Sequence, residues 1–175
     1  MNTPKMTRLD IATSLGLAVG GIGGIAGSVA PAAEVRQVLW AVDGVSLVCA
    51  AALLAVKYLR RGQDLLASGF LVFLAGETLV LSGTAAGLAA SVPSFAAGIS
   101  LWAAALVLLG VPRTFPIWGR IAGFIAALLF VVTAARIFWG EVLLPTDAPL
   151  PTLGYPFLVL SFAGWITRLI RPEAA

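Results

Sequence analysis

Two carboxylates lie inside long apolar segments of this sequence and are its strongest candidates for chemistry. Asp43 lies in an apolar stretch near residues 37–57, and Glu77 lies in another near 65–89. An ionised side chain at the centre of a lone transmembrane helix costs about 2.5–3.5 kcal/mol, so such residues tend to face a bundle interior and to have a function. A buried carboxylate of this kind can carry a proton or bind a cation.

The spacing predicts that the two carboxylates lie at the same depth. Asp43 precedes Lys57 by 14 residues and Glu77 follows Asp64 by 13. At 1.5 Å per residue, each carboxylate therefore lies about 20 Å from the end of its helix that meets the connection between the two helices. A tight connection makes these helices antiparallel neighbours. We expect Asp43 and Glu77 to meet, with at least one protonated near neutral pH, because two adjacent carboxylates in a low dielectric cannot both ionise cheaply.

Arg136 is a candidate counter-charge for this pair. It lies about 28 Å along the stretch near 117–138, one to two helical turns above the acids, and its long side chain can reach down or up. A hydroxyl residue accompanies each charged residue at helical spacing. The candidate ligand- or proton-binding residues are Asp43, Glu77, Arg136, Ser46, Thr84 and Thr133.

This predicted cluster has three interpretations. As a structural device, Arg136 pairs with one acid and locks three helices together. As a functional device, a carboxylate exchanges a proton or a cation with water from one side at a time. In the third interpretation, Arg136 reaches only the outer interface, and the two acids face a water-filled vestibule.

Six apolar stretches position these residues. Hydrophobic residues make up 60% of the sequence and charged residues 11%, and the mean hydropathy is +1.02, values typical of a protein with lipid as its solvent. A helix of about 20 apolar residues crosses the hydrocarbon core and satisfies its own backbone amides. We predict an all-α bundle of six transmembrane helices in one domain, residues 1–175. The helices are expected near 11–30, 37–57, 65–89, 94–112, 117–138 and 152–170.

Basic residues indicate the orientation of this bundle. Nine fall on one side and two, Arg36 and Arg136, on the other, and positively charged loops stay in the cytoplasm. Both termini are therefore predicted to be cytoplasmic. The Ala, Gly, Leu and Arg bias favours a bacterial inner-membrane protein. The first stretch is expected to remain a span, because it is too long for the core of a signal peptide and Pro31 would follow the cut.

Small residues form two stripes that predict close helix packing. The first recurs every four residues and the second every seven. The stripe residues are Gly16, Gly20, Gly24 and Ser28 in the first stretch, and Gly69, Gly76 and Gly83 in the third. The longest connection, Gly140 to Pro151, either covers an outward cavity or acts as a stiff connector.

The composition excludes several kinds of site. Histidine is absent and Cys49 is the one cysteine, which removes intrachain disulfides, His-ligated haem and the usual zinc sites. Cys49 is expected to pack as a small apolar residue. We predict no cofactor and no metal site, and an enzyme is not favoured. The pI of 9.6 reflects topology rather than nucleic-acid binding, because no basic domain is present.

Two functions remain, and no motif chooses between them. One is a small-solute or ion transporter or channel that uses the Asp43 and Glu77 region. The other is a non-catalytic accessory, scaffold or assembly subunit of a larger membrane complex. The expected partners are the lipid bilayer and either a second copy of the chain or a membrane-complex subunit.

The predicted topology can be tested with reporter fusions or cysteine labelling. The loops around Arg60 and Arg113 should be cytoplasmic, because most basic residues lie on their side of the membrane. Glu34, Val92 and Asp147 should be external. Labelling of position 147 from the cytoplasmic side alone would contradict the orientation.

Overall fold

The protein is all-helical. A computed structural model describes residues 6–171, which form six α-helices and no strand; the termini themselves, 1–5 and 172–175, lie outside the described residues. The helices are α1 Arg8–Val29, α2 Ala33–Leu59, α3 Asp64–Thr84, α4 Val92–Gly110, α5 Ile117–Phe138 and α6 Gly154–Ile170. Helices α1 to α5 are long and apolar enough to cross a membrane, and α6 has 17 residues. The all-α prediction is confirmed for these residues.

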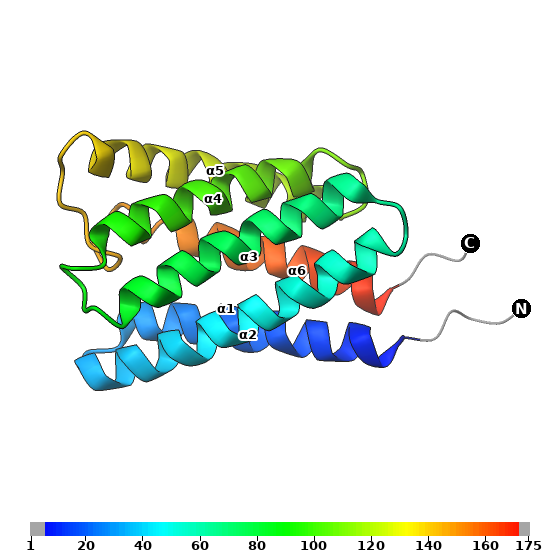
Figure 1. Ribbon diagram of the computed structural model, residues 1–175, viewed down its shortest axis with the longest axis horizontal. Helices are drawn as coiled ribbons and strands as arrows, with labels where there is room; N and C mark the ends of the chain where they lie inside the picture. The colour runs from blue at the N-terminus through cyan, green and yellow to red at the C-terminus, as the bar shows by residue number, and fades with distance from the viewer. Residues whose placement is uncertain (1–5, 172–175) are drawn as a thin grey trace, which may run out of the picture.

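The six helices run up and down and close into a ring. Each helix packs against its neighbours in the sequence, and α1 also packs against α6. Figure 1 shows that α1 begins and α6 ends at the same end of the bundle. Helix α5 packs only against α4 and α6, so it is not a neighbour of α2 or α3. This order decides which side chains can meet.

Two helix ends differ from the sequence prediction by more than three residues. Helix α3 ends at Thr84 rather than near residue 89, because Gly87 takes a left-handed backbone conformation with φ of +89° and the chain turns there. Helix α2 begins at Ala33 rather than near residue 37. The added first turn contains Glu34 and Arg36. The prediction followed the length of the apolar stretch and so left these polar residues out, whereas the helical backbone includes them.

Aromatic side chains fill the interior of the ring. Neighbouring rings lie 5.1–6.3 Å apart between centroids, mostly edge to face, a favourable arrangement beyond the apolar area that it buries. The cluster consists of Tyr58, Phe70, Phe73, Trp102, Phe115, Phe130, Phe162 and Trp165. It draws on every helix except α1 and on the α4–α5 connection, and it closes the interior toward the end where α1 begins.

A buried ion pair joins α1 to α2 at that same end. The Thr7 hydroxyl accepts a hydrogen bond from the Asp10 N–H at 3.1 Å, and the Asp10 carboxylate accepts one from the Thr7 N–H at 3.2 Å, which caps α1. The Lys57 ammonium pairs with the same carboxylate. Asp10 lies in the first turn of α1 and Lys57 in the last turn of α2, so each charge also complements its helix dipole.

Both stripes of small residues face a neighbouring helix. Gly16, Gly20 and Gly24 lie against α2, and Gly69, Gly76 and Gly83 lie against α4. Ser28 continues the first stripe and donates its hydroxyl to the Gly24 carbonyl at 2.8 Å. Cys49, by contrast, is exposed, and the expectation that it packs inside is wrong. It shares the outward face of α2 with Val42 and Val45, both exposed at helical spacing from it.

The closest helix approach gives a stability prediction. A Cβ added at Gly76 would lie 2.7 Å from the Gly98 backbone carbonyl, so Gly76→Ala forces α3 and α4 apart. We expect a loss of about 1–3 kcal/mol in the free energy of unfolding, measured by denaturant titration in detergent.

The matched control is Gly21→Ala on α1. Its Cβ would meet only side chains at an ordinary 3.4 Å, and alanine favours the helix by about 0.5–1 kcal/mol. Equal stability of the two variants would contradict the close packing of α3 on α4.

Candidate functional site

A cavity of about 240 Å³ lies within the ring, at the end away from the start of α1. Side chains of α1, α2, α3, α4 and α6 line it, together with the α3–α4 and α5–α6 connections, and α5 contributes none. Its floor includes Trp102 and Phe162, which belong to the aromatic cluster. The aromatic cluster therefore closes the cavity on the side toward the start of α1.

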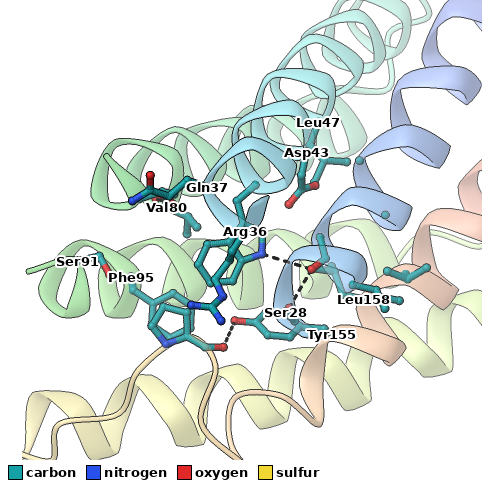
Figure 2. A pocket seen from close by; sticks show the side chains of 18 of the residues that line it. Ser28, Arg36, Gln37, Asp43, Leu47, Val80, Ser91, Phe95, Tyr155 and Leu158 are labelled. Carbon is teal, nitrogen blue, oxygen red and sulfur yellow. Dashed lines mark hydrogen bonds between the residues drawn. The ribbon is translucent and has the colours of Figure 1, made fainter. Parts of the chain in front are cut away.

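One face of α2 runs down the cavity wall. Arg36, Trp40, Asp43 and Leu47 follow at intervals of four, three and four residues, which places them on a single helical face. Figure 2 shows Arg36 and Gln37 toward the connecting loops, with Asp43 and Leu47 further along the helix. Arg36 was not predicted as a site residue, although its spacing of seven residues from Asp43 places the two on one helical face.

The Asp43 carboxylate occupies space that α1 leaves open. A Cβ added at Gly24 would lie 3.0 Å from Asp43 Oδ2, and one added at Gly20 would lie 3.3 Å from Oδ1. Oδ1 is buried and accepts no hydrogen bond from the described residues. The glycines that bring α1 close to α2 thus also make room for an acidic side chain.

Glu77 lies beneath the cavity on the adjacent helix. Its residue is 2% exposed, and it lies one turn deeper than Val80 and two turns deeper than Thr84, both of which line the cavity. Its carboxyl group is close enough to Asp43 for the two charges to interact. The indole of Trp102 approaches it, but Glu77 Oε2 and Trp102 Nε1 have no hydrogen-bond partner among the described residues. The two acids thus lie within electrostatic range of each other on adjacent helices.

Arg136 does not join them, and its expected role as their counter-charge is wrong. It forms an ion pair with Glu141 at 2.6 Å beyond the end of α5, with 45% of its side chain exposed. The physical reason is the order of the ring, because α5 packs against neither α2 nor α3. Arg136 therefore lies at the exposed end of its helix and does not reach the acids.

The three hydroxyl candidates separate in the same way. Thr84 lines the cavity and donates to the Val80 carbonyl at 3.0 Å. Thr133 is fully buried on α5, away from the cavity lining, and donates to Leu129 at 2.8 Å. Ser46 turns its backbone carbonyl toward Gly16 of α1 and does not line the cavity. Only Thr84 is therefore placed to meet a cavity ligand.

Arg36 shapes the loop end of the cavity. Its Nη2 donates to the Ala30 carbonyl at 2.7 Å, and its guanidinium carbon lies 6.0 Å from the centre of the Trp40 ring. Trp40 in turn donates its indole N–H to the Gly24 carbonyl at 3.4 Å. These contacts hold the guanidinium near the α1–α2 turn, away from Asp43.

The α5–α6 connection covers part of the cavity. Pro145 lines it and accepts a hydrogen bond from the Tyr155 hydroxyl at 3.0 Å (Figure 2). The connection is tied internally, because the Asp147 carboxylate accepts from the Leu144 N–H at 2.8 Å and its carbonyl accepts from the Thr152 hydroxyl at 2.6 Å. Of the two interpretations of this segment, cavity cover has direct contacts in its favour.

The arrangement suits reversible binding of a small molecule. It combines a cavity, two acids without a basic partner and aromatic walls. Within residues 6–171, no three His, Cys, Asp or Glu side chains are grouped to hold a metal ion. Comparisons with protein-family models, curated proteins and solved structures found no significant match. The cavity itself is therefore the basis for a functional conclusion.

Proposed function

We propose that this chain is a membrane transporter that binds a small solute in the cavity beside Asp43. The observation that carries the proposal is the Asp43 carboxylate, which lines a cavity yet has no ion-pair partner among the described residues. A carboxylate that lies inside an apolar bundle without an ion-pair partner is best explained by reversible binding of a ligand or a proton.

The outer surface of the ring supports a position within the bilayer. Large apolar side chains face outward along the helices, among them Ile22, Val45 and Leu128, each more than half exposed, as lipid contact requires. We propose that α6 is the sixth span. Its 17 residues reach only about 25 Å, and the α5–α6 connection covers the space that it leaves.

The proposed orientation places the cavity on the outer side of a bacterial cytoplasmic membrane. The excess of basic residues at the opposite end favours cytoplasmic termini. In this orientation the described conformation faces outward, with its inner side closed by the aromatic cluster and by the Asp10–Lys57 ion pair. Transport would require these contacts to separate while the cavity end closes, as alternating access demands.

The Asp43–Glu77 pair offers a means of coupling transport to protons. Two neighbouring carboxyl groups favour a shared proton over two charges, and a bound solute would change that balance. Release of a proton on solute binding would link the two movements in opposite directions.

Proteoliposomes carrying an internal pH dye test this function. We expect the wild-type protein to move protons when members of a panel of small organic solutes are added outside. Asp43→Asn and Glu77→Gln should each abolish the signal, because each removes an ionisable group but keeps the side-chain shape.

Glu141→Gln is the control, since it removes an exposed acid outside the cavity. Size-exclusion profiles and melting temperatures should show that all variants fold. Wild-type rates in both cavity variants would contradict the proposal. An inactive wild-type protein that elutes with a stoichiometric membrane partner would instead support an accessory subunit.

A further inference from the structure

Acidic side chains outnumber basic ones at the cavity. Among the described residues, Arg36 is the one basic residue that lines the cavity, and Asp43 lines it with Glu77 beside it. Two other basic residues are engaged in ion pairs, Lys57 with Asp10 and Arg136 with Glu141. The two acids favour a shared proton when no ligand is bound, which leaves one negative charge to one positive charge. A ligand with a single positive charge could take the place of that proton and keep the region neutral.

The cavity walls near these two acids are aromatic. Trp40, Phe95, Trp102, Tyr155 and Phe162 all line it. Aromatic faces attract ammonium groups, most strongly where water is excluded. Trp102 is only 5% exposed and its indole approaches Glu77, so the deep end combines an aromatic ring with a carboxyl group.

Size and ligand chemistry favour an organic cation over a metal ion. A 150 Å³ apolar cavity holds benzene, so a cavity of about 240 Å³ holds about ten non-hydrogen atoms. Calcium prefers six to eight oxygen ligands, far more than two carboxyl groups supply. Anions are disfavoured by the two acids, and the Arg36 guanidinium is turned toward the Ala30 carbonyl.

We propose that the solute is a small monovalent organic ammonium ion. Its charged group lies beside Asp43 and Glu77, and its apolar part lies against Trp40, Phe95 and Phe162. This assignment rests on the solute-binding function proposed for the cavity and names the class of solute. Arg36 at the loop end acts against a second positive charge, which restricts the ligand to a monocation.

Three probes that share one ring and differ in charge test the proposal: benzylammonium, benzyl alcohol and benzoate. Each is titrated into the purified full-length protein in detergent. Binding is followed by tryptophan fluorescence, since Trp40 and Trp102 line the cavity, and by the melting temperature. We expect benzylammonium to bind at least about tenfold more tightly than the other two, because only it can replace the shared proton with another positive charge.

Variants separate the cavity from non-specific binding. Asp43→Asn should weaken benzylammonium binding at least about tenfold, and Glu141→Gln should leave it unchanged. An unaltered affinity in Asp43→Asn would overturn the assignment. If Asp43→Asn does not fold, the comparison of the three charges on the wild-type protein decides.

The three probes distinguish the cationic class of the solute from solute binding in the cavity. Equal or tighter binding of benzoate or benzyl alcohol overturns the cationic class but leaves a solute-binding cavity. Absence of any response to all three probes contradicts both the cationic class and the solute-binding function.

Discussion

Two neighbouring carboxyl groups lie inside an apolar helix ring without an ion-pair partner among the described residues. Burying such groups is unfavourable unless water, a proton or a ligand compensates them. The cavity provides that access for Asp43, and Glu77 lies directly beneath it. Helix order keeps these acids apart from the predicted counter-charge, because Arg136 is carried on a helix that touches neither α2 nor α3.

The α1–α2 contact combines packing and polarity in one interface. At the cavity end, Gly20 and Gly24 bring the helices together and leave space for the Asp43 carboxylate. At the other end, Asp10 and Lys57 form a compensated pair that holds the helices together. One interface thus has a closed, neutralised end and an open, acidic end. This asymmetry is what an alternating-access mechanism would act upon.

Apolar length and helical spacing predicted much of this arrangement, and tertiary order explains what they missed. The six helices follow from apolar stretches that only a helix can satisfy in lipid, and equal depth brought Asp43 and Glu77 together. The pairing of Arg136 with the acids was predicted wrongly because helical periodicity does not determine which helices are neighbours in the ring. Arg36 and Trp40 were overlooked as site residues although they share the Asp43 face, and the α3 end was overrun because residues 85–89 remain mostly apolar after the backbone turns.

We propose that water reaches Asp43 from one side of the membrane through the cavity. The direct measurement is labelling of single cysteines by a membrane-impermeant thiol reagent, with Cys49→Ser as background. Asp43→Cys should react from the outer side and not from the inner side. Val45 lies at nearly the same depth, on the face of α2 that points away from the bundle, and is 56% exposed. Val45→Cys should not react, because lipid carries neither water nor the reagent. Equal inertness of both cysteines, or labelling of position 43 only from the inner side, would contradict the account.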